Sequence, residues 1–250
     1  ADLVICENPK HSLKLLNKLG IKKKLVSLHD YNENLVIEKL SKQLSAKKIV
    51  LISDAGSPLI SDPGYKLIRH CIKNKIEITS IPGPSAIIPA LQLSGISSNE
   101  FYFAGFIPKS RPKIIEFINK IKEKGCTSVF FVSSHKLNLC LKIMKDIIGN
   151  RYISVSKELT KINENTFRGF GNELEDIISK YKVNLKGEFV VVVERKSLKK
   201  TKSTDLDIYN NEINKLLLKF SLTDVVEIVH KLTGISKNKV YKWVLNLKNS

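Results

Sequence analysis

Short apolar runs alternate with amphipathic stretches through most of the chain, and this rhythm predicts an α/β fold. The runs are rich in branched residues and have the length of strands buried in a parallel sheet. They predict strands at residues 3–6, 24–28, 49–52, 76–81, 101–106, 128–132, 152–156 and 189–194, with 166–170 as the arm of a hairpin. Apolar residues at helical spacing, with suitable caps, predict helices at 12–19, 34–45, 63–74, 86–95, 112–124, 136–148 and 172–181.

Residues 49–95 hold two of these strands, and each strand ends in a loop of glycine and proline that leads into a helix. The first loop is 53–58 and the second is 82–85. Asp62 and Pro63 suit the start of the first helix, because aspartate is a favoured N-cap and proline a favoured first residue. Open α/β sheets bind ligands at the carboxyl ends of their strands. The two loops therefore predict a crevice edged by backbone N–H and C=O groups, although ordinary strand-to-helix connections have the same composition.

The pattern changes after the last predicted strand. Residues 196–203 are polar and basic, as in an exposed linker, and 207–219 have helical spacing. Ser221 and Ser236 are suited to cap two further helices, and Gly234 ends the first of them. A helix, a glycine turn and a second helix with exposed lysines resemble a helix-turn-helix that contacts nucleic acid. A packing module or a dimer contact explains the apolar faces of these helices equally well.

The chain is strongly basic. Its 42 Lys and Arg residues outnumber its 24 Asp and Glu residues, so the formal charge is +18. This charge suits a polyanion such as RNA, DNA or an acidic membrane surface, although a lysine-rich solvated surface has the same balance. The cysteines at 6, 71, 126 and 140 form no Cys-x-x-Cys pair, so they indicate neither a zinc site nor a disulfide framework. No apolar run has the ~20 residues of a membrane helix and no signal peptide is visible. We expect a cytoplasmic protein that binds no membrane and no metal.

The motif DAGSPLISDPG at residues 54–64, followed by PGPSA at 82–86, resembles the tetrapyrrole-methylase superfamily of S-adenosylmethionine-dependent methyltransferases. More narrowly, it is similar to the family of enzymes that methylate the 2′-hydroxyl of a cytidine in bacterial 16S ribosomal RNA. Further motifs follow in the family's order at 7–12, 29–33, 131–136, 157–161 and 186–188. The chain departs from the family at residues 8–10, at Val132, where the family has Glu, and at Lys136, where it has Arg.

The resemblance implies an architecture. It consists of two α/β domains of the tetrapyrrole-methylase type with a cofactor crevice between them, plus a small C-terminal helical module. The expected domains are 1–107, without the first strand of the family, 108–196, and 204–250, which is helix-turn-helix-like. Pro, Lys and Arg concentrated in 108–112 read as an exposed linker at the boundary. The implied cofactor is S-adenosyl-L-methionine, and the implied partners are 16S rRNA in the small ribosomal subunit and a second copy of the chain, as a homodimer.

The resemblance also implies site residues. Backbone groups of the two loops are expected to hold the methionine end of the cofactor, and strand-end residues are expected to form a slot for its adenine. The candidate cofactor-binding residues are Asp54, Ala55, Gly56, Ser57, Pro58, Pro82, Gly83, Pro84, Ser85, Phe131, Val132, Ser133 and Leu159. Basic side chains near the domain boundary and in the tail are candidates for binding RNA: Lys109, Arg111, His135, Lys136, Lys237, Lys239 and Lys242.

Methyl transfer to an oxygen requires accurate positioning of both reactants and removal of the hydroxyl proton. The candidate bases or orienting groups are Glu158, Lys161 and Glu188, and weaker candidates are Glu7 and His29. Structural roles stay open for these residues. Glu188 can cap a backbone turn, Glu158 can form a surface ion pair, and a lone histidine such as His29 is more often structural.

Two other functions remain open. A methylase of the same fold could act on a tetrapyrrole or another small acidic molecule, and a protein that has lost its activity could still bind RNA. The basic helical tail and the motifs at 133–136 and 158–161 favour the RNA enzyme over the small-molecule enzyme. A cofactor-binding titration separates the inactive RNA binder from both enzymes.

Overall fold

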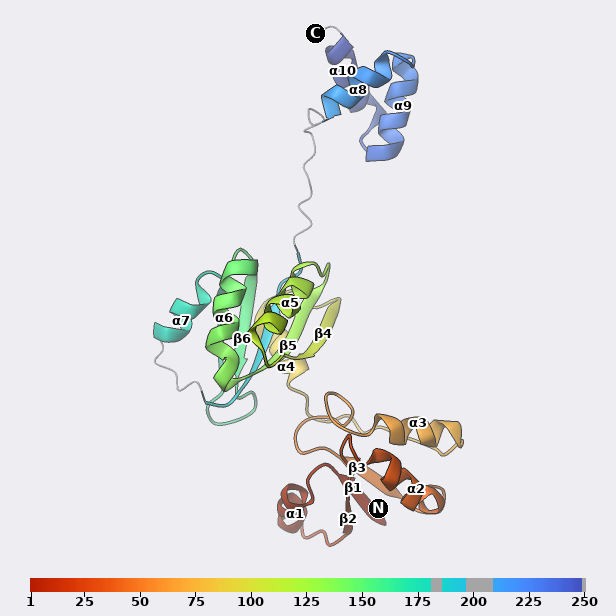
Figure 1. Cartoon of the computed structure of the whole chain (residues 1–250), viewed down its shortest axis with the longest axis vertical. Helices are drawn as coiled ribbons and strands as arrows, with labels where there is room; N and C mark the ends of the chain where they lie inside the picture. The colour runs from red at the N-terminus through yellow and green to blue at the C-terminus, as the bar shows by residue number, and fades with distance from the viewer. Residues whose placement is uncertain (181–185, 197–208, 249–250) are drawn as a thin grey trace. The chain divides into compact units, whose positions relative to one another are not determined.

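The computed structural model describes residues 1–180, 186–196 and 209–248. The chain divides into two compact units, Ala1–Lys196 and Ser197–Ser250 (Figure 1). The first unit contains both sheets and seven of the helices described below, and the second contains three helices. The predicted basic linker at 196–203 lies almost wholly outside the described residues.

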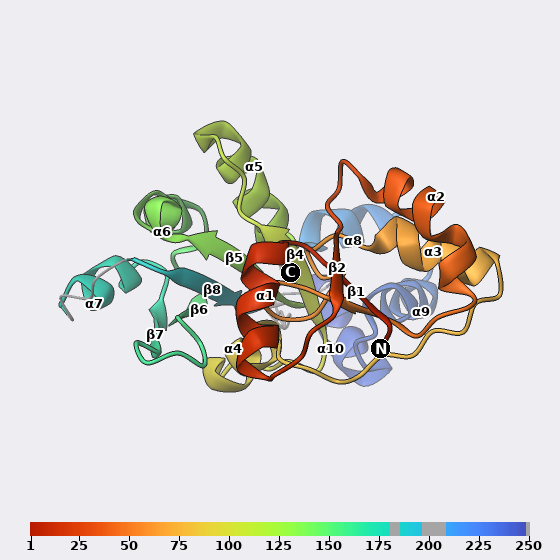
Figure 2. The same ribbon diagram turned by 90° about the horizontal axis from the view of Figure 1, so that it is seen from below.

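The first sheet has three parallel strands in the order β2-β1-β3. The elements of this region are β1 (Leu3–Cys6), α1 (Pro9–Lys18), β2 (Lys24–Ser27), α2 (Glu33–Leu44), β3 (Ile49–Ile52) and α3 (Tyr65–Lys73). The central strand, β1, is buried along its whole length. Side chains alternate across a strand, so Leu3 and Ile5 share one face, where they form a core with α2 and α3. Helix α1 lies on the other side of the sheet (Figures 1 and 2).

The structure differs from the sequence prediction at residues 76–81. Within the described residues this apolar segment pairs with no strand, and Ile78 and Ile81 are exposed. The preceding strand, β3, lies at an edge of its sheet, and Val50 is 40% exposed, so β3 is not buried on both faces. An apolar run shows that a segment prefers burial. A strand also needs a neighbour to pair its backbone groups, and the run carries no information about that neighbour.

The start of α3 is held by a carboxylate from another helix. Glu33, at the first position of α2, is 4% exposed. Its Oε1 accepts a hydrogen bond from the Gly64 N–H at 2.7 Å, and its Oε2 accepts one from the Lys66 N–H at 2.8 Å. The first N–H groups of a helix have no partner within the helix. Glu33 therefore supplies the cap that the sequence assigned to Asp62, and Gly64, with φ of +126°, occupies the N-cap position.

The neighbouring residues of the 29–33 motif also have structural roles. Asn32 is the N-cap residue of α2, but its side chain bonds to the preceding turn rather than to the helix. Its Oδ1 accepts the His29 N–H at 2.8 Å, and its Nδ2 donates to the Ser27 carbonyl at 3.1 Å. The motif therefore fixes the turn between β2 and α2 and holds Glu33 within hydrogen-bond distance of the first N–H groups of α3.

The second sheet has five strands in the order β4-β5-β8-β6-β7. The strands are β4 (Phe101–Phe106), β5 (Thr127–Ser133), β6 (Tyr152–Lys157), β7 (Asn165–Phe170) and β8 (Glu188–Val193). Strand β4 is parallel to β5, and the other three neighbouring pairs are antiparallel. Strands β6 and β7 form the predicted hairpin. Strands β4, β5 and β6 therefore end at the edge of the sheet where β8 begins.

Helices cover both faces of the second sheet (Figure 1). They are α4 (Ile87–Ser94), α5 (Arg111–Lys122), α6 (Ser134–Ile148) and α7 (Leu174–Lys180). One face packs against α5, α6 and α7 in the largest apolar core of the chain, and the opposite face packs against α4. The sequence placed α4 and β4 in the first domain, before the boundary at 107 and 108. In the structure, β4 is a strand of the second sheet, where it pairs with β5, and α4 packs on that sheet in a core with Val129 and Val190.

The C-terminal unit contains α8 (Asn210–Leu217), α9 (Leu222–Thr233) and α10 (Lys237–Lys248). Five valines and Ile213 form its buried core. As predicted, Ser221 caps α9, with its Oγ accepting the Asp224 N–H at 3.2 Å, and Gly234 ends α9 with φ of +69°. No helix in the described ranges is long and apolar enough to cross a membrane.

Replacing Glu33 with alanine is expected to lower the free energy of unfolding by about 1–3 kcal/mol, because the buried Gly64 N–H loses its acceptor. Glu38→Ala, at an exposed position on the same helix, is the matched control and should change the free energy by less than about 0.5 kcal/mol. Urea unfolding measures both values. Equal unfolding free energies for the two variants would show that the Glu33 contact does not stabilise the fold.

Candidate active site

The two loops of glycine and proline lie side by side. The Ser57 hydroxyl donates a hydrogen bond to the Pro84 carbonyl at 3.2 Å. In the first loop, the Ser53 hydroxyl donates to the carbonyls of Ala55, at 3.3 Å, and Gly56, at 3.0 Å. Gly56 has φ of +75°, a left-handed conformation that favours glycine. The predicted adjacency of the loops is thus observed, and it holds exposed backbone groups of 55–56 beside those of 82–84.

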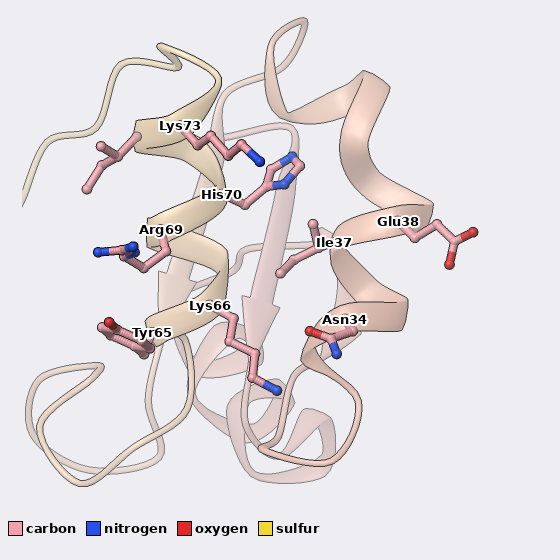
Figure 3. Close-up of a pocket in the computed structure, with 9 residues that line it drawn as sticks. Asn34, Ile37, Glu38, Tyr65, Lys66, Arg69, His70 and Lys73 are labelled. Atoms are coloured by element: carbon pink, nitrogen blue, oxygen red, sulfur yellow. The ribbon is translucent and has the colours of Figure 1, made fainter.

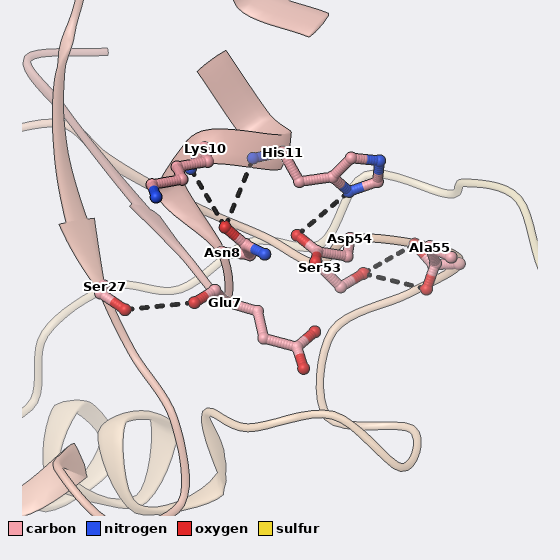
Figure 4. A network of polar contacts seen from close by, with 9 residues as sticks. Glu7, Asn8, Lys10, His11, Ser27, Ser53, Asp54 and Ala55 are labelled. Carbon is pink, nitrogen blue, oxygen red and sulfur yellow. Dashed lines mark hydrogen bonds and ion pairs between the residues drawn. The ribbon is translucent and has the colours of Figure 1, made fainter. Parts of the chain in front are cut away.

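Carboxylates gather where the first-sheet strands lead into these loops (Figure 4). Glu7 follows β1, Asp54 follows β3, and Asp62 lies further along the same loop. Burial, with Asp62 and Asp54 nearby, raises the pKa of Glu7, and burial raises the pKa of Asp62. His11 Nδ1 lies 3.4 Å from Asp54 Oδ1, an oxygen that is buried and accepts no hydrogen bond within the described residues.

This group of carboxylates suits a cationic ligand group, because burial and then neighbouring carboxylates raise the pKa values of Glu7 and Asp62, and a positive charge beside them would favour their ionised forms. From the sequence, Asp54 is a candidate cofactor contact, Glu7 is a weaker candidate base and Asp62 is expected to cap a helix. The signal for the group was the strand-end position of Glu7 and Asp54. Among the described residues, no group of three or more His, Cys, Asp or Glu side chains has an arrangement that could hold a metal ion.

A second set of candidate residues lies at the edge of the second sheet where β4, β5 and β6 end. Ser133, the last residue of β5, is opposite Glu188, the first residue of β8. The Glu158 N–H donates to the Glu188 carbonyl at 2.9 Å, which joins the end of β6 to the start of β8. The motifs at 131–136, 157–161 and 186–188, well separated in the sequence, therefore meet at one edge.

The three predicted catalytic residues form one cluster at this edge. Lys161 Nζ lies 3.1 Å from Glu158 Oε1 and 3.0 Å from Glu188 Oε2. Glu158 Oε1 also accepts the Glu188 N–H at 2.9 Å. The backbone is strained here, because Glu158 and Thr160 have φ of +47° and +66°. Gly187 is needed beside them, since a Cβ at this position would lie 2.7 Å from the Glu158 carboxyl carbon.

Glu158, Lys161 and Glu188 differ in pKa shift and in exposure, and these differences indicate different roles. The hydrogen bond to Glu188 and the nearby Glu158 raise the pKa of Lys161, so this side chain is a cation at neutral pH and cannot act as a base. The hydrogen bond from the Glu188 backbone N–H is the main cause that lowers the pKa of Glu158, and the hydrogen bond from Lys161 is the second. Glu158 is therefore a weaker base. The carboxylate of Glu188 is 77% exposed, and it is the member of the cluster most accessible to a substrate hydroxyl.

The strand-end residues predicted to hold the adenine differ in their surroundings. Phe131 and Leu159 belong to one apolar cluster, and the Phe131 ring lies 5.0 Å from that of Phe106. Val132 is 1% exposed and packs into the core on the opposite face, so its side chain cannot line a ligand site. Ser133 Oγ lies 3.4 Å from His135 Nε2. An apolar wall for a flat ring is thus available at Phe131 and Leu159 but not at the Val132 side chain.

The structure brings together four of the predicted RNA-binding residues. Lys109 lies in the connection from β4 to α5, Arg111 is the first residue of α5, and His135 lies in the first turn of α6, all three exposed. Lys136 Nζ donates to the Ile107 carbonyl at 3.5 Å, which joins the first turn of α6 to the connection that follows β4. The other three candidates, Lys237, Lys239 and Lys242, are exposed on α10 in the C-terminal unit.

Comparison with known proteins identifies similar sequences. The model of the tetrapyrrole (corrin/porphyrin) methylases matches residues 1–175. The chain is 36% identical to ribosomal RNA small subunit methyltransferase I of Haemophilus influenzae, over 98% of this chain and 87% of that protein. It is 38% identical to the protein of the same name from Halalkalibacterium halodurans, over 78% of this chain and 67% of that protein.

Comparison with solved structures supports the fold alone. Uroporphyrin-III-C-methyltransferase from Thermus thermophilus superposes with a TM-score of 0.51, covering 78% of this chain and 82% of that one. The sequence identity is 14%, so the likeness carries no information about the substrate.

The carboxyl of Glu158 is expected to titrate below its ordinary pKa of 4.5. Its stabilising effect is present above the pKa of the unfolded chain and is lost as the pH falls through the lower folded value. In Lys161→Met, the pKa of Glu158 should rise yet stay below 4.5, because the larger cause, the Glu188 N–H, remains. Side-chain NMR titration measures both values. An ordinary pKa for Glu158 in Lys161→Met would show that the ion pair alone causes the shift.

Proposed function

Because this chain belongs to the ribosomal RNA small subunit methyltransferase I family of the tetrapyrrole methylases, we propose that it methylates 16S rRNA. The reaction transfers a methyl group from S-adenosyl-L-methionine to the ribose 2′-oxygen of a cytidine in the small ribosomal subunit. The observation that carries the proposal is the 36% identity over 98% of the chain to a relative named for this type of reaction. The site geometry then suggests which residues take part.

The loops fit the polar end of S-adenosyl-L-methionine. Asp54 Oδ1 is a buried carboxylate oxygen that accepts no hydrogen bond among the described residues, with His11 Nδ1 at 3.4 Å, and it suits the ammonium of an amino acid. The backbone N–H groups of Gly83 and Gly56, two exposed residues, suit a carboxylate. Glu7 and Asp62 add negative charge beside Asp54. Phe131 and Leu159 offer an apolar wall to the adenine.

The bound cofactor supplies an electrophilic methyl group on sulfur, so the work of the protein is to position the ribose and manage its proton. Glu188 has the exposed carboxylate, and it accepts a hydrogen bond from the 2′-hydroxyl and orients it. Lys161 stays protonated and places a positive charge beside the oxygen as negative charge develops there. Glu158 holds Lys161 and the start of β8 in place through two hydrogen bonds to its carboxylate.

The RNA is bound mainly through its phosphates. Lys109, Arg111, His135 and Lys136 lie at the same sheet edge as Glu188, and α10 presents further lysines. The formal charge of +18 favours long-range attraction to the ribosomal particle. A 2′-hydroxyl distinguishes RNA from DNA, which agrees with an RNA-specific enzyme. We also propose a cytoplasmic location and a homodimeric state, on the basis of the family resemblance.

Gly83→Leu is expected to abolish cofactor binding, because it places a side chain where the backbone must approach the ligand. The nearest atom to a Cβ at Gly83 is the Ile81 carbonyl oxygen, at 3.9 Å, so the variant should fold. Gly125→Leu, at a position with open space around its Cβ, is the matched control. Calorimetric titration with S-adenosylhomocysteine measures affinity. Unchanged affinity in a folded Gly83→Leu protein would exclude this loop from the site.

The reaction itself is tested with small ribosomal subunits that lack the modification, incubated with the protein and methyl-labelled cofactor. Nuclease digestion and mass spectrometry should place the label on the 2′-oxygen of one cytidine of 16S rRNA. Subunits that already carry the modification are the control and should take up no label. Label on a base, or label only on a small molecule, would contradict the proposed reaction.

A further inference from the structure

A groove between α2 and α3 is lined by a stripe of basic side chains. Lys66, His70 and Lys73 follow the spacing i, i+4 and i+7 along α3, so they occupy one side of the helix, and Arg69 adds a fourth basic side chain to the lining. The groove has a volume of about 780 Å³. Figure 3 shows Lys66, His70 and Lys73 extending from α3 toward α2, with Arg69 beside Tyr65 on the other flank of α3.

The charges of this stripe lack partners. Among the described residues, Lys66, Arg69 and Lys73 lie within 4.0 Å of no carboxylate. Of the described residues that line the groove, Glu38 is the single acidic one. Like charges at this spacing on a helix repel one another, and an anionic ligand would turn that repulsion into attraction.

We propose that this groove binds the phosphodiester backbone of the RNA substrate, an inference that rests on the proposed function. Three permanently charged side chains spread over two turns of helix match a chain of phosphates better than a single small anion. Tyr65 is 64% exposed beside Arg69, and an exposed aromatic ring next to cations can stack on an unpaired base. Ile37 and the lysine stems give the groove an apolar floor.

The position of α3 gives this contact a role in the reaction. The helix follows directly from the loop that begins at Asp54, and Glu33 fixes both Gly64 and Lys66 at its start. Phosphates bound along α3 are therefore held at a fixed place relative to the cofactor loop. Phosphate contacts set the register of a nucleic acid without reading its sequence. The groove thus serves to position the strand that carries the reacting ribose.

The test replaces Lys66, Arg69 and Lys73 with glutamine in one protein. The matched control replaces Lys14, Lys18 and Lys22, three exposed lysines on and just after α1, so that both variants lose three positive charges. Fluorescence anisotropy with a labelled single-stranded RNA measures affinity over a range of salt concentrations. The α3 variant should bind about tenfold more weakly at 0.1 M salt, and the negative slope of log affinity against log salt should become shallower by about 2, at roughly 0.7 per phosphate contact. Methylation of small subunits should show a raised KM.

Three outcomes decide the proposal. Equal RNA affinity and equal salt slope for the two variants would overturn it. An α3 variant that changes the oligomeric state in light scattering while keeping its RNA affinity would also overturn it, in favour of a protein contact. Unchanged cofactor affinity in calorimetry, together with the loss of RNA affinity, would support it. A wild-type protein that binds RNA through the groove but transfers no methyl group would refute the proposed function and leave the groove standing.

Discussion

Two backbone N–H groups at the start of α3 depend on one buried carboxylate, that of Glu33. This contact joins α2 to α3 across the face of the first sheet, so it determines where the loop between β3 and α3 ends. The loop begins at the end of β3, an edge strand of the first sheet, and ends at Gly64, whose N–H bonds to Glu33. Both ends of the loop are therefore anchored, and the Ser57 hydroxyl, within the loop, bonds to the Pro84 carbonyl of the second loop. The proposed cofactor contacts at Asp54 and the proposed phosphate contacts on α3 both depend on this anchoring.

The second sheet holds the proposed catalytic residues Glu158, Lys161 and Glu188, and here too a carboxylate bonded to a backbone N–H fixes the local structure. Strands β5 and β6 end beside the start of β8, and reciprocal hydrogen bonds between Glu158 and Glu188 close the gap between them. The strained backbone at Glu158 and the glycine at 187 allow the Glu158 carboxylate to turn back over the strand. One consequence is that Lys161 sits between two carboxylates and keeps its proton. Its contribution is then charge rather than proton removal, which leaves Glu188 as the accessible acceptor.

Most of the secondary structure could be predicted because its signals are local. Strand β3 and helix caps such as Ser221 and Gly234 follow from apolar runs and capping residues, and the structure has them where the sequence placed them. Prediction failed where the answer depends on a distant partner. Residues 76–81 have the composition of a strand but no neighbour to pair with among the described residues, and α3 is capped by Glu33 rather than by the nearby Asp62. The meeting of three motifs at one sheet edge is a result of strand order, which the sequence pattern alone does not contain.

The two loops of glycine and proline form the proposed cofactor site, on which the other assignments depend. Hydrogen exchange of backbone amides, measured by mass spectrometry with and without S-adenosylhomocysteine, tests it most directly. Exchange should slow in peptides that cover 53–58 and 82–85 and stay unchanged in α10, because the ligand would bond to the loop N–H groups and exclude water from them. Saturating ligand that slows exchange elsewhere and leaves both loops unchanged would contradict the account.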